Sequence, residues 1–88
     1  GTCWTSALMS QKKDILKIDA LDFSYHRIND LAPKTILSLN GNLDKINRIL
    51  GSFYDIKRDN NYYDVIVLSQ AYHHAEFPLK LFHECDRV

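Results

Sequence analysis

The apolar residues of the chain occur in short runs that predict alternating helices and strands. Helices are expected at residues 4–13, 25–39 and 78–88, and strands at residues 15–21, 46–50 and 64–68. Residues 65–68 are apolar at four consecutive positions, which is typical of a strand covered on both faces in a parallel sheet. Strand 46–50 contains two polar residues, so it is expected at an edge. This order of elements predicts an α/β fold with a parallel sheet flanked by helices.

The second helix carries its own signals for a start, a break and an end. Ser24 is a suitable N-cap, because its hydroxyl accepts hydrogen bonds from the first N–H groups of a helix. Pro33 disfavours helix at the residue before it and suits the first turn of a new helical segment. Asn40 and Gly41 form a C-cap. Together these signals predict a broken helix over residues 25–39.

Composition narrows the class of protein. An 88-residue chain with 45% hydrophobic and 25% charged residues is expected to form one small domain of marginal stability. Eleven basic residues balance eleven acidic ones, which gives no electrostatic footprint for nucleic acid or an anionic membrane. No signal-like segment and no membrane-spanning run is expected. Cys3 and Cys85 are expected to be reduced thiols in a cytoplasmic protein.

Polar and aromatic residues follow the predicted strands. Ligands of open α/β sheets bind beyond the carboxyl ends of the strands, so function is expected in residues 69–74. Asp22 ends the first strand and has two open interpretations: a favourable charge at a helix N-terminus, or an acceptor for a ribose diol. Phe53 and Tyr54 follow the second strand and either cover a flat ring or pack in the core; composition favours the core.

Three landmarks stand in an order that resembles a known family. Ala-Leu-Asp-Phe-Ser closes the first strand and Leu-Gly-Ser-Phe closes the second. Tyr-Asp-Val-Ile-Val-Leu-Ser then leads to His-His, Pro-Leu and a helix ending Glu-Cys-Asp-Arg-Val. Over residues 1–88 the chain resembles the middle of a class I S-adenosylmethionine-dependent methyltransferase of the small Rossmann-like type. The resemblance implies a fragment of one domain with a partial Rossmann-like fold of about three strands, lacking the central first strand and the C-terminal strands. A sheet in the order 46–50, 15–21, 64–68 is expected.

The resemblance also implies a cofactor, S-adenosylmethionine, and methyl transfer to a small-molecule acceptor. The residues implied to bind the cofactor are Gly1, Thr2, Cys3, Asp22, Phe23, Ser52, Phe53, Ser69 and Gln70. Gly1 to Cys3 is similar to the tail of the family's Gly-x-Gly-x-Gly loop, with Cys3 in place of the last glycine. Asp22 would take the ribose hydroxyls, and Phe23 would pack beside the adenine. Ser52 stands where the family usually has an acidic residue for the adenine amino group.

The loop after the third predicted strand is implied to lie at the reacting centre. Ser69 and Gln70 would lie under the methionine part of the cofactor, and Tyr72 and His73 would face the substrate. His74 is a candidate general base, since an unperturbed histidine pKa of about 6.5 suits proton transfer. The alternative is that His74 only fills the loop before the last helix. A metal site at the two histidines lacks a third ligand in the sequence.

Two other classes of function remain open. A non-catalytic Rossmann-like nucleotide-binding or interaction module is favoured by Cys3 and Ser52, which both depart from the family pattern. A nicotinamide-dependent oxidoreductase shares the acidic residue after a strand, but the Tyr-Asp-Val-Ile-Val-Leu-Ser stretch argues against it. Because no central strand precedes Gly1, we also expect the isolated chain to bind S-adenosylmethionine poorly and to be inactive.

Overall fold

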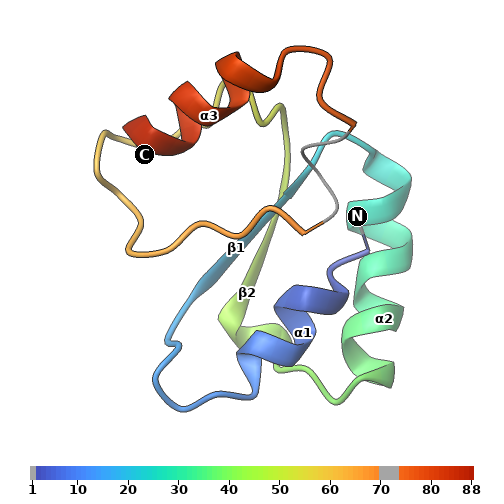
Figure 1. Cartoon of the computed structure of the whole chain (residues 1–88). Coiled ribbons are helices and arrows are strands. Elements are labelled where there is room, and N and C mark those ends of the chain that lie inside the picture. Colours follow the sequence, from blue (N-terminus) through green and yellow to red (C-terminus); the bar gives the residue numbers. More distant parts are fainter. Residues whose placement is uncertain (1, 70–73) are drawn as a thin grey trace. The chain divides into compact units, whose positions relative to one another are not determined.

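The computed structural model describes residues 2–69 and 74–88 and divides into two compact units, Gly1–Gly51 and Ser52–Val88 (Figure 1). The elements of the first unit are α1 (Trp4–Ser10), β1 (Ile18–Asp22), the π-helix η1 (His26–Leu31), α2 (Ala32–Ser38), the short 3-10 helix η2 (Leu43–Lys45) and β2 (Ile46–Leu50). β1 and β2 pair in parallel, with Ile18 opposite Ile46 and Asp22 opposite Leu50. The helical segment η1–α2 connects the two strands, so this unit is a βαβ motif. The expected α/β class and the bounds of the second strand are confirmed.

Small apolar side chains form the core of the first unit. The fully or nearly buried residues are Ala7, Ala20, Ile28, Ala32, Ile36 and Ile46. The close approach of α1 to the end of α2 requires Gly41, because a Cβ there would lie 2.8 Å from Cγ2 of Ile36 and 2.9 Å from Cα of Ala7. Asn40 takes a left-handed φ of 56°, and the Gly41 N–H donates to the Ile36 carbonyl at 2.7 Å. The predicted C-cap is therefore confirmed.

The first helix is shorter than its sequence pattern predicts, since α1 ends at Ser10 and not at residue 13. The Lys12 N–H donates to the Met9 carbonyl at 3.1 Å, which tightens the chain out of α-helical geometry. The Lys45 ammonium then donates to the Ser10 and Lys12 carbonyls at 3.1 Å each. A cation from a distant segment thus satisfies carbonyl groups at and after the end of α1.

The second helix is not interrupted at Pro33 as predicted: Ala32, the residue before it, is helical with φ −59° and ψ −45°, and only the hydrogen-bond register changes there. η1 is π-helical and α2, which has Pro33 in its first turn, is α-helical. The Arg27 N–H donates to the Ser24 hydroxyl oxygen at 3.4 Å, so Ser24 lies at the predicted N-cap position.

The second unit contains one helix, α3 (Pro78–Arg87), among its described residues. Leu81 is fully buried and Val88 nearly so, whereas Phe82 is about half exposed. α3 also carries Leu79 on its exposed side. None of the helices in the described ranges has the length and apolar character needed to cross a membrane.

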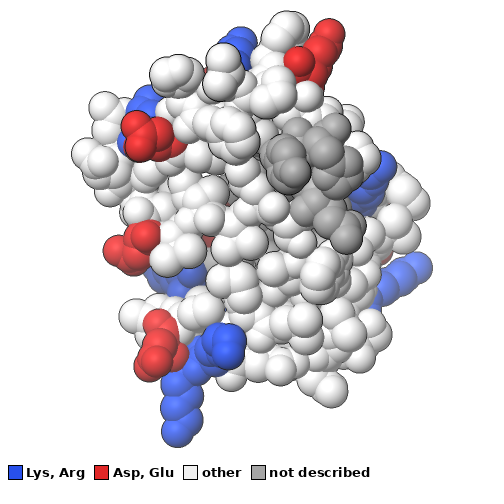
Figure 2. All heavy atoms as spheres, in the orientation of Figure 1, with Lys and Arg blue, Asp and Glu red and all other residues white. Residues whose placement is uncertain are grey.

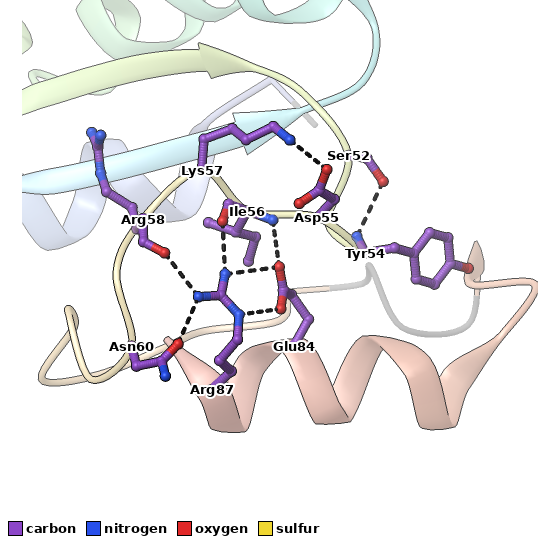
Figure 3. A network of polar contacts seen from close by, with 9 residues as sticks. All are labelled: Ser52, Tyr54, Asp55, Ile56, Lys57, Arg58, Asn60, Glu84 and Arg87. Carbon is purple, nitrogen blue, oxygen red and sulfur yellow. Dashed lines mark hydrogen bonds and ion pairs between the residues drawn. The ribbon is translucent and has the colours of Figure 1, made fainter.

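A network of polar contacts joins α3 to the loop of residues 55–61 (Figure 3). Arg87 donates to both carboxylate oxygens of Glu84, from Nε at 2.6 Å and from Nη2 at 3.0 Å. The same guanidinium donates to the Ile56 carbonyl at 2.8 Å, the Arg58 carbonyl at 2.9 Å and Oδ1 of Asn60 at 3.0 Å. The Arg87 hydrogen bonds outweigh desolvation and lower the pKa of Glu84 to about 2. A planar fork with five N–H donors is the group that such an arrangement requires.

Residues 64–68 do not form the predicted third strand: within the described ranges the sheet consists of β1 and β2. Val65 is 72% exposed, and Ile66 and Val67 are exposed as well, so the segment is not covered on both faces as a central strand would be. An apolar run becomes a strand only when its N–H and C=O groups pair with a neighbouring strand, and these 88 residues supply no such partner in the described part. The predicted sheet order is therefore wrong in its third member, and the sheet has two strands instead of three.

Candidate functional site

The carboxyl end of β1 carries a buried carboxylate. Asp22 is the last residue of β1 and is only 9% exposed. Its Oδ1 accepts a hydrogen bond from the Ser24 N–H at 2.7 Å. Burial raises the pKa of the Asp22 carboxyl, but hydrogen bonds, among them the bond from Ser24, outweigh burial and hold the pKa below its ordinary value. The carboxylate is therefore charged at neutral pH and fixed in direction by the turn that follows the strand.

An exposed aromatic ring adjoins this carboxylate in the chain. Phe23 is 73% exposed, although phenylalanine is normally among the more buried residues. The Gly51 N–H donates to the Asp22 carbonyl at 2.9 Å, which continues the strand pairing past Leu50. The end of β1 thus presents a fixed negative charge beside an apolar ring with no cover over most of its surface.

Cys3, before α1, has the backbone conformation of a glycine. Its φ of 69° and ψ of 26° lie in the left-handed region, which residues with a Cβ seldom adopt. Burial raises the pKa of the Cys3 thiol; the Asp22 carboxylate adds to this rise and Arg48 opposes it. Cys3 and Asp22 therefore lie near enough to interact, so the turn before α1 and the end of β1 come together. Thr2 precedes Cys3 in this turn and is partly buried.

Replacing Cys3 with glycine should stabilise the chain by about 0.5–1 kcal/mol. Relief of the left-handed strain is worth about 1–2 kcal/mol, and the greater freedom of glycine in the unfolded chain offsets part of it. Urea unfolding followed by the fluorescence of Trp4, the single tryptophan, measures this change. Cys3→Ala is the control, because it removes the thiol and keeps the Cβ. Equal stabilities of the two variants would contradict strain at this position.

In the second unit, Ser52 and Phe53 begin a small aromatic cluster. The Ser52 hydroxyl accepts from the Tyr54 N–H at 3.1 Å, and the Phe53 ring meets the Tyr54 ring edge-on at 4.7 Å between centroids. The Tyr54 hydroxyl accepts from the Phe77 N–H at 3.0 Å, and the Lys80 ammonium lies 5.6 Å from the Tyr54 ring centre. Phe53 is thus partly buried against the Tyr54 ring and is not among the buried residues of the core.

The remaining candidates lie on either side of an undescribed stretch. Ser69 and His74 are both exposed. The predictions for Gly1, Gln70, Tyr72 and His73 concern residues outside the described ranges. In the part of the chain that the structure describes, no group of three or more His, Cys, Asp or Glu side chains is placed to hold a metal ion. Both cysteines are free and half-buried.

Comparison with known proteins decides the family. A family model described as "Methyltransferase domain" matches residues 1–88, which is the whole chain. The chain belongs to the methyltransferase domain family. No curated protein and no solved structure gives a significant match.

Membership of the methyltransferase domain family confirms the resemblance seen in the sequence, and the α/β unit is consistent with a partial Rossmann-like methyltransferase fold. The family typically uses S-adenosylmethionine. The groups at the end of β1 fit the nucleoside part of that molecule: a charged carboxylate can accept from two ribose hydroxyls, and the exposed Phe23 ring matches a flat apolar base. The left-handed Cys3 also fits the place of a family glycine.

Some residues of this methyltransferase domain were missed by reasoning from the sequence. Phe77 and Lys80 join Tyr54 through a backbone hydrogen bond and a cation–π contact, and no local motif links positions so far apart. Arg48 was interpreted only as a polar residue of an edge strand, yet its guanidinium reaches the helical crossover. The one available signal for the role of Arg48 was a proline within a helix. Proline has no N–H, so a carbonyl one turn earlier needs another hydrogen-bond donor.

Proposed function

We propose that this chain is the S-adenosylmethionine-binding core of a methyltransferase that acts on a small-molecule acceptor. The observation that carries the proposal is the buried, charged Asp22 at the carboxyl end of β1, beside the exposed Phe23, in a chain that a methyltransferase family model matches from end to end. Asp22 accepts hydrogen bonds from the ribose hydroxyls, and Phe23 lies against the adenine. The turn at Cys3 brings its backbone close to the cofactor.

The cofactor, when bound, supplies a methyl group on a sulfonium centre, which an oxygen, nitrogen or carbon atom of the acceptor attacks in line. The protein contributes by holding the two reactants in that geometry and excluding water, which is worth about 7–11 kcal/mol in well-oriented reactions. By the family resemblance, Ser52 and Phe53 would contribute to binding of the adenine, and Ser69 to binding of the methionine part. An imidazole nitrogen of His74 takes the proton that the acceptor loses, as a general base.

Charge supports a small acceptor in preference to nucleic acid. The formal net charge is zero at pH 7, and on the face drawn in Figure 2 basic side chains lie among acidic ones instead of gathering in one patch. Nucleic-acid binding draws most of its affinity from clustered Lys and Arg. A cytoplasmic location, in which the two half-buried thiols stay reduced, is part of the proposal.

Calorimetric titration with S-adenosylmethionine, its demethylated product and NAD tests the proposal. The titrations are made on the 88-residue chain and on the complete polypeptide that its gene encodes. We expect the complete polypeptide to bind both sulfur nucleosides and not NAD, and the 88-residue chain to bind them more weakly. Preference for NAD, or no binding of either sulfur nucleoside by the complete polypeptide, would overturn it.

A non-catalytic nucleotide-binding module is the second candidate. It is favoured by the exposed Ser52, whose hydroxyl already accepts from the Tyr54 N–H and which lacks the charge of an acidic residue. Binding of S-adenosylmethionine with no radiolabelled methyl transfer to any member of a broad metabolite mixture would support this candidate. Release of the demethylated product during incubation with that mixture would exclude it.

A further inference from the structure

The crossover between β1 and β2 contains an unusual junction. In η1, helical hydrogen bonds follow the π pattern, and the Ala32 N–H donates to the Arg27 carbonyl five residues back. The next residue is Pro33, which has no N–H to donate. The junction between the π-helical and α-helical segments therefore falls at the position where the backbone cannot supply a donor.

The absence of an N–H at Pro33 leaves two carbonyl groups, those of Ile28 and Asn29, without a possible backbone donor. An N–H at position 33 would reach the Ile28 carbonyl in π register and the Asn29 carbonyl in α register. Both carbonyls instead accept a hydrogen bond from the same side-chain atom: Nη1 of Arg48 lies 2.9 Å from the Ile28 oxygen and 3.4 Å from the Asn29 oxygen. Arg48 is in the middle of β2, opposite Ala20 of β1. A guanidinium from the neighbouring strand thus stands in for the missing backbone N–H.

A chain of hydrogen bonds links this junction to the carboxylate at the end of β1. Arg48 donates to the Ile28 carbonyl, and the Ile28 N–H donates to the Ser24 carbonyl at 3.1 Å. The Ser24 N–H in turn donates to Oδ1 of Asp22 at 2.7 Å. Ile28 is also a core residue, only 5% exposed, so a shift of its backbone would disturb the close-packed side chains around it.

We propose that Arg48 and Pro33 act as a pair: Pro33 withholds a backbone donor, Arg48 supplies it, and together they keep η1 in π register so that Ser24 orients the Asp22 carboxylate. Arg48 is a positioning residue and does not itself touch the cofactor. The consequence for affinity rests on the proposed function, whereas the register and the orientation of Asp22 do not.

Five variants of the 88-residue chain test the pair: Arg48→Gln, Arg48→Lys, Pro33→Ala, the double variant Arg48→Gln with Pro33→Ala, and Lys34→Gln as a control that removes one exposed cation from α2, the helix that contains Pro33. Hydrogen exchange measured by NMR reports the protection of the Ile28 and Ser24 amides. Scalar couplings across hydrogen bonds identify which carbonyl accepts from the new N–H of Ala in place of Pro33. Titration of the Asp22 carboxyl reports its burial and its hydrogen bonds, including the bond from Ser24, together with the charge of Arg27.

We expect Arg48→Gln to reduce protection of the Ile28 and Ser24 amides by about tenfold, since each buried hydrogen bond is worth about that factor. In the double variant, the new N–H should donate to Asn29 in α register. In this double variant, protection of the Ile28 amide should return, but the Asp22 pKa should still be higher than in the parent chain. Arg48→Lys should recover part of the protection, because an ammonium supplies one donor without the planar fork.

Affinity separates positioning from mere stability. In the complete polypeptide, the double variant should bind S-adenosylmethionine about tenfold more weakly than the parent even though its helix is stable again. Recovery of affinity together with protection would overturn the positioning role. Unchanged Ile28 protection and an unchanged Asp22 titration in Arg48→Gln would overturn the pair itself. If the parent polypeptide binds no S-adenosylmethionine, the proposed function fails, and the couplings and the Asp22 titration alone decide whether the pair sets the register.

Discussion

Replacing Asp22 with alanine should weaken binding of S-adenosylmethionine to the complete polypeptide by about 10- to 100-fold. A hydrogen bond to a charged group contributes about 1.5–3 kcal/mol, and the carboxylate is proposed to accept from the ribose diol. Its surroundings exclude most water, since Asp22 is 9% exposed, and the Ser24 N–H holds it in one orientation. Isothermal titration calorimetry measures the change directly.

Two further variants make the Asp22 result specific. Asp22→Asn keeps the size and one acceptor oxygen but loses the charge, so its affinity should fall between those of the parent and the alanine variant. Asp30→Asn removes a carboxylate from η1 whose partners are His26 and Asn29, and its affinity should stay within about twofold of the parent. An alanine variant of Asp22 that folds and binds as tightly as the parent would show that this carboxylate does not hold the cofactor.

Replacing Arg87 with alanine should release the loop of residues 55–61 from α3. The change removes every hydrogen bond of the guanidinium and leaves the Glu84 carboxylate, whose side chain is only 11% exposed, without its cation. Amide protection in residues 55–61 and in α3 should fall at least tenfold, because several partly buried hydrogen bonds are lost together. Hydrogen exchange followed by mass spectrometry locates the effect, and the first unit serves as an internal reference.

The ion pair between Arg87 and Glu84 also makes the stability of the second unit depend on pH. The folded pKa of Glu84 is about 2, below its ordinary value of 4.5, so the pair stabilises the folded unit fully above about pH 4.5. That contribution declines as the pH falls from 4.5 and is lost near pH 2. In Arg87→Ala, NMR titration should find the Glu84 pKa back near its ordinary value, and this part of the acid dependence should disappear.

A lysine variant is the control for charge alone. Arg87→Lys keeps the positive charge and loses the planar fork, so it should lower the Glu84 pKa in part and protect residues 55–61 only weakly. Full protection in the lysine variant would show that charge, and not the shape of the guanidinium, holds the loop.

The parts of the fold that local signals determine were predictable from the sequence. Strand 46–50 was predicted with its observed bounds, and the Asn40–Gly41 cap has the cause assigned to it, whereas Pro33 changes the helical register and does not interrupt the helix. The choice of π register before Pro33 is not visible in the pattern of apolar residues. It depends on Arg48, a residue of a strand that lies 20 positions farther along the chain.

The predicted third strand shows where the pattern of apolar residues is insufficient. Residues 65–68 have the composition of a strand buried on both faces, but composition cannot supply a hydrogen-bonding neighbour. The candidate site was likewise predictable only in part. Asp22 was a candidate from its position at the end of a strand and from the family resemblance, and Cys3 from the resemblance; the structure brings them near enough for their charges to interact. The aromatic cluster at Tyr54 depends on contacts between distant residues, which no motif encodes.

The segment from Tyr62 to Leu68, most of whose side chains are exposed, has a practical consequence for work with this polypeptide. It combines aromatic and β-branched side chains with a single charged residue, Asp64, which is the sequence signature of a steric zipper. The zero formal net charge at pH 7 provides no colloidal repulsion to keep copies apart. Fibril formation and loss of solubility should therefore be greatest near neutral pH and high concentration. Buffers well away from neutrality, or a lysine in place of Val65 or Val67, should keep the chain monomeric during measurement.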